Sequence, residues 1–268
     1  WRHRNYQRSG QQVQKTGKGS ISRVIVFMKE REIYTDLRCA PPLIIRVDGR
    51  NFKKTLSRQN LDKPYDSKFA SAMADAIELF FKKSGISPVF AYTFSDEINL
   101  FFQDTAFDRR VEKLDSVIPS FLSSALTMQM DTDEPLSFDS RIVPLTYKHI
   151  HEYMIWRQSE SWRNCINSYG YYTLLSEGWS ENDAAKHMKG LKSSDIHEML
   201  FKRGINLAKV AQWHRRGIMV YKTEYEIEGF NPILNQKTTT TRAKVVQNWN
   251  VPLFQSEDGI KFLQKFID

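Results

Sequence analysis

Two aspartates stand where the sequence predicts that buried strands end. Asp48 directly follows the apolar run Leu43–Val47, and Asp96 lies between the apolar runs Val89–Phe94 and Ile98–Phe102. Carboxylates that meet in this way can bind two Mg²⁺ ions about 3.5–4 Å apart, which stabilise the attacking and leaving oxygens of a phosphoryl transfer. Magnesium needs few protein ligands when substrate phosphates complete its coordination shell. We therefore predict Asp48 and Asp96 as catalytic metal ligands.

The residues beside the two aspartates are compatible with either a catalytic or a structural role. The Gly49 carbonyl oxygen is a candidate further ligand, because a glycine at a strand end leaves its backbone open. Aspartate, glycine and serine are also ordinary turn residues, so the pattern alone leaves a catalytic and a structural interpretation open. Glu97, beside Asp96, is expected either to support the site or to face solvent.

The loop after Asp48 has the composition of a phosphate-binding segment. It consists of Gly49, Arg50, Asn51, Phe52 and Lys53. Backbone N–H groups in such a loop can form a concavity that binds the anionic groups of a triphosphate. The loop is not a Walker motif, which requires GxxxxGK[ST]. Lys54 and Lys63 add positive charge nearby, and the alternative interpretation is a solvated basic loop.

A second basic cluster follows the hairpin. Arg109, Arg110 and Lys113 are spaced so that they share one face of a helix predicted from about Asp108. Such a face can bind a second triphosphate or the 5′ phosphate of an RNA. The alternative is an ordinary solvent-exposed helix face.

The elements that must position these residues alternate between strand and helix patterns. Asp66 can cap a helix that Gly85 ends, and the second helix carries Pro119 as a predicted kink. A fourth strand is predicted at Arg141–Leu145. The order is βαββαβ, the ferredoxin-like arrangement of the α+β class, in which the first strand lies beside a hairpin strand. Asp48 and Asp96 are therefore expected to meet.

The C-terminal half has a different pattern. Residues 148–213 are predicted to be mostly helical, Gly217–Glu228 and Thr238–Trp249 alternate like two strands of a long hairpin, and 257–266 fit a last helix. We predict three segments: a basic, flexible N-terminal extension (1–27), a palm that carries the catalytic residues (28–147), and a C-terminal helical and hairpin extension (148–268).

Charge and composition narrow the class of partner. The 268 residues carry a net charge of +8 with a pI of about 9.3, and such an excess attracts polyanions such as nucleic acid. Cys39 and Cys165 are the only cysteines, too few for a disulfide framework or a zinc site, which favours a reducing cytoplasm. No stretch approaches 18 apolar residues, so we expect no membrane partner.

Several segments together carry a resemblance to a known family. They are RVDGRNFKK (46–54), DKPYDS (62–67), YTFSDEINLFF (92–102), FDSRIV (138–143), WRQSE (156–160), DIHEMLF (195–201) and RRGIMV (215–220). They resemble the tRNA-histidine guanylyltransferase family, and most closely its archaeal guanylyltransferase-like members, which are 3′–5′ polymerases. The likeness covers about residues 28–222, and the DGRNF and SDE blocks are specific in combination.

The resemblance implies a polymerase-type palm that adds nucleotides in the 3′ to 5′ direction. It implies a tRNA substrate, two Mg²⁺ ions, GTP as the nucleotide donor, ATP where the tRNA 5′ end must be activated, and a homotetramer that one tRNA spans. The family's metal ligands fall on Asp48, Gly49 and Asp96. Its nucleotide contacts fall on Asp48, Gly49, Arg50, Asn51, Phe52, Lys53, Lys63, Ser95 and Asp96. The residues for the tRNA 5′ end or a second triphosphate fall on Arg110, Lys113 and Asn164.

Two departures from the family pattern affect the expected activity. Trp162 stands where eukaryotic members have a histidine, and Ile196 stands where they have a lysine; of that neighbourhood only Asn164 clearly matches. These positions are tied to activation and tRNA handling, so their loss favours template-dependent addition over untemplated marking of histidine tRNA. Two alternatives are another palm enzyme such as a cyclic-dinucleotide synthase, whose GG[DE]EF turn is absent, and a non-catalytic RNA-binding protein.

Overall fold

The computed structural model describes residues 27–56, 59–231 and 236–267. The chain divides into two compact units, residues 1–37 and 38–268. In the first unit, residues 27–37 form a short helical turn followed by hydrogen-bonded turns. The basic N-terminal extension predicted for residues 1–27 lies, apart from its last residue, outside the described residues. Within the described ranges, no helix is long and apolar enough to cross a membrane.

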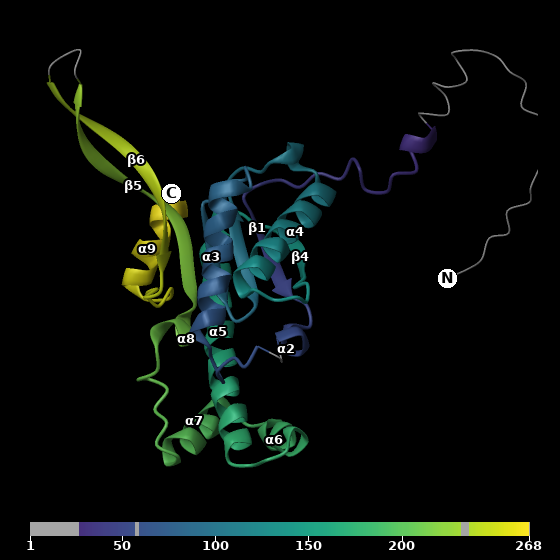
Figure 1. The fold of residues 1–268 in the computed structure, drawn as a ribbon, viewed down its shortest axis with the longest axis vertical. Coiled ribbons are helices and arrows are strands. Elements are labelled where there is room, and N and C mark those ends of the chain that lie inside the picture. Colours follow the sequence, from purple (N-terminus) through teal and green to yellow (C-terminus); the bar gives the residue numbers. More distant parts are fainter. Residues whose placement is uncertain (1–26, 57–58, 232–235, 268) are drawn as a thin grey trace, which may run out of the picture. The chain divides into compact units, whose positions relative to one another are not determined.

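The second unit contains strands and helices in an order that follows the sequence patterns. In chain order they are β1 (Leu43–Gly49), α2 (Phe52–Thr55), α3 (Ser67–Lys83), β2 (Phe90–Phe94), β3 (Glu97–Phe102), the 3₁₀ turn η2 (Phe107–Arg109), α4 (Val111–Met130), β4 (Phe138–Pro144), α5 (Tyr147–Ser176), α6 (Glu181–Met188), α7 (Ser193–Lys202), α8 (Gln212–Arg216), β5 (Ile218–Asn231), β6 (Gln236–Asn248) and α9 (Glu257–Ile267). Figure 1 labels these elements.

One sheet contains all six strands, in the order β4-β1-β3-β2-β5-β6. Every neighbouring pair is antiparallel. The first four strands have the ferredoxin-like order, which confirms the predicted βαββαβ topology. The hairpin β5–β6 extends this sheet, because β5 pairs with β2 from Thr93 with Ile218 to Phe90 with Tyr221.

The alternation of β1 separates the two faces of the sheet. Leu43, Ile45 and Val47 are fully buried in a cluster with the apolar faces of α3 and α4, which lie in front of the sheet in Figure 1. Ile44 is fully buried on the other face, in a cluster with residues of α5 and α9. A strand buried on both faces has a nearly continuous apolar sequence, as β1 has.

Helix α3 begins where its cap predicts. The Asp66 carboxylate accepts a hydrogen bond from the Phe69 N–H at 3.0 Å, and a second from the Asp62 N–H at 2.8 Å. A side-chain oxygen at this position satisfies one of the N–H groups that have no partner inside the helix. The same carboxylate therefore fixes both the helix start and the turn 62–66 before it.

Helix α4 begins three residues later than predicted. Residues 107–109 all have positive φ, and Arg110 is extended and forms an isolated antiparallel bridge with Arg38. This pairing holds the backbone out of the helical region until residue 111. The prediction that Arg109 and Arg110 share a helical face with Lys113 is therefore wrong, since only Lys113 lies on α4.

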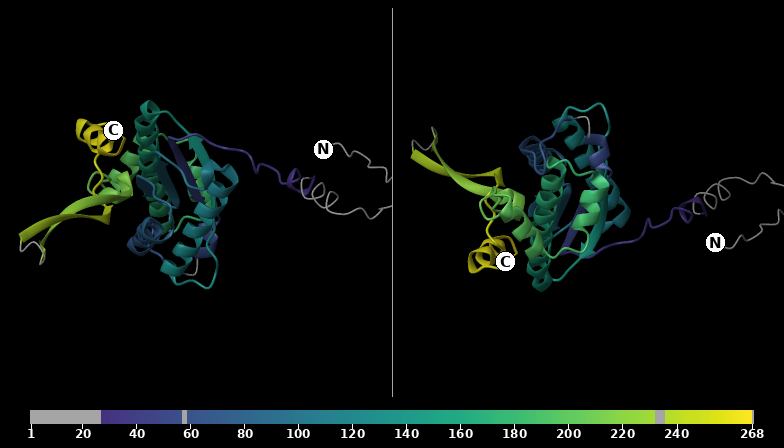
Figure 2. Two further views of the ribbon diagram at one scale, coloured as in Figure 1. Left: turned by 90° about the horizontal axis from the view of Figure 1, so that it is seen from above. Right: turned by 90° about the horizontal axis from the view of Figure 1, so that it is seen from below.

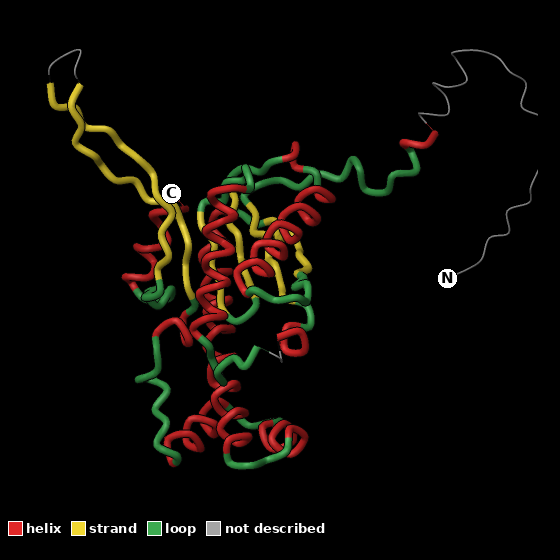
Figure 3. Tube along the Cα trace, viewed as in Figure 1, coloured by secondary structure: helices red, strands yellow, loops and turns green. Residues whose placement is uncertain are grey.

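The outer part of the hairpin consists of two strands only. Beyond Tyr221, β5 pairs with β6 alone, from Lys222 with Val245 to Asn231 with Gln236. Figure 3 shows this part running on past the helices that flank the sheet, and both views of Figure 2 show it projecting from the second unit. Near its base, Tyr221 packs against Phe262 and Phe266 of α9.

We predict that Gly217→Ala lowers the free energy of unfolding by about 2 kcal/mol or more. Gly217 joins α8 to β5 with φ 73° and ψ −170°, a region that only glycine adopts readily. An added Cβ would lie 2.6 Å from the Thr93 carbonyl oxygen. The matched control is Gly178→Ala, where φ is also positive but no atom lies within 4 Å. Urea unfolding midpoints measure both, and equal midpoints for the two variants would contradict the prediction.

Candidate active site

The two predicted catalytic aspartates are brought together by a close backbone approach. The Gly49 N–H donates a hydrogen bond to the Asp96 carbonyl oxygen at 3.0 Å. A Cβ at Gly49 would lie 2.9 Å from the Asp96 Cβ and 2.8 Å from the Phe52 ring, so only glycine fits here. Burial and the nearby Asp48 charge raise the pKa of Asp96 above its usual range. The turn between β2 and β3 therefore lies directly against the end of β1.

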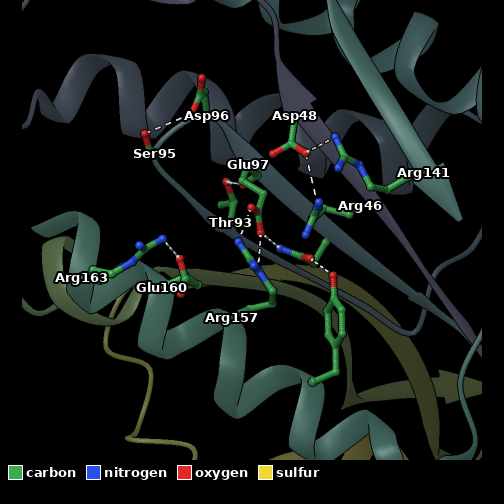
Figure 4. A network of polar contacts seen from close by, with 12 residues as sticks. Arg46, Asp48, Thr93, Ser95, Asp96, Glu97, Arg141, Arg157, Glu160 and Arg163 are labelled. Carbon is green, nitrogen blue, oxygen red and sulfur yellow. Dashed lines mark hydrogen bonds and ion pairs between the residues drawn. The ribbon is translucent and has the colours of Figure 1, made fainter. Parts of the chain in front are cut away.

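Asp48 has two arginine partners, one on its own strand β1 and one on the neighbouring strand β4. Arg46 Nε lies 3.3 Å and Arg141 Nη2 3.2 Å from the same oxygen, Oδ2, as Figure 4 shows. Arg46 and Arg141 are opposite one another in the pairing of β1 with β4. Sequence analysis missed both arginines, although the spacing of Arg46 and Asp48 places them on one face of the strand.

Glu97 turns out to be a buried structural anchor. Its carboxylate accepts a hydrogen bond from Arg157 Nε of α5 at 2.9 Å and from Asn99 Nδ2 at 2.7 Å. The Tyr153 hydroxyl donates to Asn99 Oδ1 at 2.7 Å. The Glu97 and Arg157 side chains are only 9% and 7% exposed. Of the two expectations for Glu97, the structure favours support of the site, by connecting its turn to α5 (Figure 4).

A cavity of about 240 Å³ opens beside Asp96. Five of the predicted site residues line it: Phe52, Lys53, Lys63, Ser95 and Asp96. Apolar walls come from Leu56, Leu61, Phe69 and Met73, and the C-terminal half adds Ser168, Tyr172 and Trp213. Small-molecule pockets typically have volumes of about 300–1,000 Å³. A cavity of this size suits a nucleobase or nucleoside whose phosphates lie outside it.

The two lysines of this cavity are held by aromatic residues of α5. Lys53 lies over the Tyr171 ring and pairs with Glu181 of α6 at 3.0 Å. The Lys63 ammonium lies 5.7 Å from the centre of the Tyr172 ring. Both lysines therefore stand at the side of the cavity that α5 forms, where they add positive charge for a phosphate chain.

An aromatic cluster supports the turn that carries Lys63. Tyr65 stacks on His214 with ring centres 4.5 Å apart and planes at 10°, and the Tyr169 hydroxyl lies 2.9 Å from His214 Nδ1. Burial and the charge of Arg215 lower the pKa of His214 to about 4, so its ring is neutral at pH 7. Sequence analysis missed this contact, because about 150 residues separate Tyr65 from His214.

The other predicted site residues, in the loop after Asp48 and on α5, have different structural roles. The Gly49 and Arg50 N–H groups already donate within the fold, to the carbonyl oxygens of Asp96 and Ser137, so these two do not contribute to an anion-binding concavity. Asn51 has a left-handed conformation at the residue before the short helix α2, and its side chain forms no capping hydrogen bond. Asn164 is half-buried on α5, on the helix face of Ser168 and Tyr172, since the three residues are four positions apart.

Arg110 lies near the other end of β1, and Lys113 follows in the first turn of α4. Arg110 bridges Arg38, which precedes the first residue of β1, Leu43, whereas the site lies at the last residues of β1. Five residues separate Leu43 from Asp48, so at about 3.4 Å per residue the two ends are on the order of 17 Å apart. Within one chain, Arg110 therefore does not join the two aspartates.

The oxygen atoms at the end of β1 fit a hard cation. The described ranges contain no group of three or more His, Cys, Asp or Glu side chains placed to hold a metal. Two carboxylates and a backbone carbonyl are nevertheless suitable for Mg²⁺, which prefers oxygen ligands and leaves positions for substrate phosphates and water. The donor set that fits is Asp48, Asp96 and the Gly49 carbonyl oxygen.

A ferredoxin-like palm with paired carboxylates at a strand end and a nucleoside-sized cavity beside them defines an enzyme of the nucleotidyl-transfer class. Residues 26–146 match the family model described as tRNAHis guanylyltransferase, and residues 148–261 match the model described as "Thg1 C terminal domain". The tRNA(His) guanylyltransferase of Debaryomyces hansenii is 32% identical over 202 residues, which cover 70% of this chain and 76% of that protein. A probable tRNA(His) guanylyltransferase of Dictyostelium discoideum is 28% identical and covers 75% and 81%.

Solved structures share the fold. A bacterial tRNA(His) guanylyltransferase-like protein in complex with GTP has a TM-score of 0.69 at 18% identity, covering 93% of this chain and 99% of that chain. The tRNA(His) guanylyltransferase of Saccharomyces cerevisiae has a TM-score of 0.63 at 21% identity, covering 72% and 90%. The chain belongs to the tRNA-His guanylyltransferase family, whose reaction adds guanylate to the 5′ end of tRNA, and it is a nucleotidyltransferase.

We predict that Arg157→Met costs about 3–5 kcal/mol of stability, because it leaves the buried Glu97 carboxylate without its cation. Adding Glu97→Gln to this variant should recover most of the loss, since an uncharged amide no longer needs the arginine. A double-mutant cycle on urea unfolding measures the coupling. Losses that simply add would show that the pair does not act as a unit.

Proposed function

We propose that this chain transfers GMP from GTP to the 5′ end of a tRNA, with Asp48 and Asp96 holding two Mg²⁺ ions and the Gly49 carbonyl oxygen as a further ligand. The observation that carries the proposal is the contact between the end of β1 and the turn at Asp96, beside the 240 Å³ cavity. A bacterial relative has been solved with GTP and also with ATP, which supports both as nucleotides for this cavity. The bound ions would supply charge stabilisation of the attacking and leaving oxygens.

The residues of the chain have separate tasks in this proposal. The base lies in the apolar part of the cavity, and Ser95 contacts the nucleotide beside Asp96. Lys53 and Lys63 bind the phosphate chain, together with the loop residues Arg50, Asn51 and Phe52. The 3′-hydroxyl of the incoming GTP attacks the activated 5′ phosphate of the tRNA and expels its activating group, which is AMP after ATP activation or pyrophosphate from a 5′ triphosphate. The added guanylate keeps the triphosphate of the GTP at the new 5′ end, so addition runs in the 3′ to 5′ direction, and later loss of pyrophosphate leaves a net addition of GMP.

Arg46 and Arg141 add a task that sequence analysis did not assign. Both form ion pairs with one oxygen of Asp48, so they place positive charge directly beside its carboxylate. Arg141 is 54% exposed, and its planar guanidinium can bind a phosphate in two-point fashion. In this proposal, these two arginines supply the positive charge beside the aspartates.

The proposed assembly is a homotetramer, and the proposed location is the cytoplasm. In a homotetramer, Arg110 and Lys113 of one protomer can reach a tRNA 5′ end or second triphosphate bound at another protomer, with Asn164 on the cavity side of α5. Residues 28–147 act as the palm, and 148–268 as an extension that contributes one cavity wall. The free thiols of Cys39 and Cys165 fit a reducing, cytoplasmic compartment.

A purely RNA-binding role fits the site less well. Two adjacent carboxylates repel a phosphate backbone unless cations lie between them, and a binding module gains nothing from them. A cyclic-dinucleotide synthase shares the palm topology, but the turn FSDEIN (94–99) lacks that family's motif. The pairing of Glu97 with Arg157 gives the glutamate of this turn a structural task instead.

We predict that Asp48→Ala and Asp96→Ala each lower Mg²⁺-dependent GTP incorporation into tRNA by orders of magnitude, because the pair of ions needs both carboxylates. The matched control is Asp104→Ala, which removes an exposed carboxylate just beyond the far end of β3 and should leave incorporation within about twofold. Labelled GTP and a 5′-truncated tRNA provide the assay. Near-normal incorporation by either site variant would overturn the assignment.

The two departures from the family pattern belong to one apolar cluster. Ile196 is 2% exposed in a cluster with Ile166, Leu200 and Leu207, and Trp162 packs against the same cluster. Trp162 and Ile196 thus pack together in one hydrophobic cluster, whereas the eukaryotic pattern has polar residues at both positions. Neither can bind a base by hydrogen bonds through an imidazole or an ammonium group, so selection of the added nucleotide falls to base pairing with the opposite strand.

We predict faster GTP addition opposite cytosine than opposite adenine in the acceptor stem, with good activity on a tRNA that lacks its first 5′ nucleotide. Pairing geometry then rewards the right nucleotide, whereas the palm supplies only metals and phosphate contacts. The measurement is the initial rate on matched tRNAs that differ only in the opposing base. Equal rates, or a preference set only by a histidine anticodon, would contradict template-dependent addition. They would indicate that the chain adds guanylate to histidine tRNA without a template.

A further inference from the structure

A second cavity, of about 280 Å³, lies outside the site described above and shares no lining residue with the first. One wall is a face of α5, with Ile155, Ser159 and Trp162. The other walls are Arg215 and Arg216 at the end of α8 and the segment 253–255. The cavity therefore combines an indole ring and apolar side chains with two guanidinium groups.

The two arginines have a surplus of positive charge. In the part of the chain that the structure describes, no carboxylate forms an ion pair with Arg215 or Arg216. Burial and the charge of Arg215 lower the pKa of Arg216, and Arg215 also lowers that of His214. The C-terminal end of a helix favours cations, but α8 has only five residues and two cations compete for that end.

Arg215 also carries a donor without a partner. Its Nε atom is buried and makes no hydrogen bond. A buried, unpaired donor costs free energy that native proteins normally avoid. By contrast, the backbone at Arg216 is fixed, because its carbonyl oxygen accepts hydrogen bonds from the Tyr92 hydroxyl at 2.9 Å and from Gln158 Nε2 at 3.4 Å. The side chains at this point are therefore presented by a rigid backbone and lack an anion.

We infer that this cavity is a second site for a nucleoside phosphate, with the base against Trp162 and the phosphate on Arg215 and Arg216. An aromatic ring beside arginines is the usual combination for unpaired nucleotides, because bases stack on rings and phosphates pair with guanidinium groups. The site goes beyond the proposed reaction, which uses only the first cavity. Two sources share this chemistry: an unpaired nucleotide of an RNA chain and a free nucleotide.

Binding to the full chain and to three variants tests the inference. The variants are Arg215→Gln, Trp162→Leu and the control Lys209→Gln, which removes one exposed positive charge from the loop before α8. The probes are a short single-stranded oligoribonucleotide and free GMP, each titrated by calorimetry. For an RNA source, oligoribonucleotide binding falls about tenfold or more in Arg215→Gln and Trp162→Leu but not in the control. For a free-nucleotide source, the number of GMP molecules bound per chain falls by one instead.

Unchanged binding of both probes in both cavity variants would overturn the inference. A measurement on the unaltered chain guards against variants that fail to fold: an oligoribonucleotide with 4-thiouridine should crosslink at or beside Trp162, as mapped by mass spectrometry. Crosslinks confined to other segments, with no second GMP bound, also contradict the inference. GTP incorporation by the unaltered chain is measured in parallel, and its absence would contradict the proposed function without bearing on this cavity.

Discussion

A hydrogen bond from the Gly49 N–H to the Asp96 carbonyl oxygen closes the site end of the palm sheet. It joins the last residue of β1 to the turn between β2 and β3, and any side chain at Gly49 would push the two apart. The cavity beside Asp96 is lined from both sides of this contact, by Phe52 after β1 and by Ser95 within the turn. The proposed metal ligands and the proposed nucleotide wall are thus positioned by one close backbone approach.

The buried network around Glu97 makes the C-terminal half part of the site. Glu97 and Asn99 on β3 bond to Arg157 and Tyr153 on α5. Burying an ion pair costs desolvation energy that its attraction only partly returns, so such a pair adds more to specificity of arrangement than to stability. Here the pair joins β3 to α5, whose later turns carry Ser168 and Tyr172 into the cavity wall.

Local signals predicted the fold well, and non-local contacts account for what they missed. Apolar runs located β1 to β3, and the Asp66 cap located α3, because each depends on neighbours in the sequence. The fourth strand, predicted from Arg141, begins at Phe138 instead. The start of α4 depends on the bridge between Arg38 and Arg110, which no helical pattern records. The partners of the site residues were missed for the same reason: Arg141, Arg157 and His214 reach the site from elements far along the chain.

The two aspartates differ in how far the protein compensates their charge. Asp48 already has Arg46 and Arg141 against Oδ2, so its charge is compensated by the protein. Among the described residues, the hydroxyl of Ser95 lies 3.2 Å from the Asp96 carboxylate as its hydrogen-bonding side-chain partner, and burial together with the Asp48 charge raises the pKa of Asp96. Its ionised form is therefore less stable than that of a free aspartate, and a cation that bound there would stabilise it. In the proposed reaction, Mg²⁺ would bind together with a triphosphate whose negative charges offset its own, so the arginines on Asp48 would not have to leave for the loaded site to stay close to neutral.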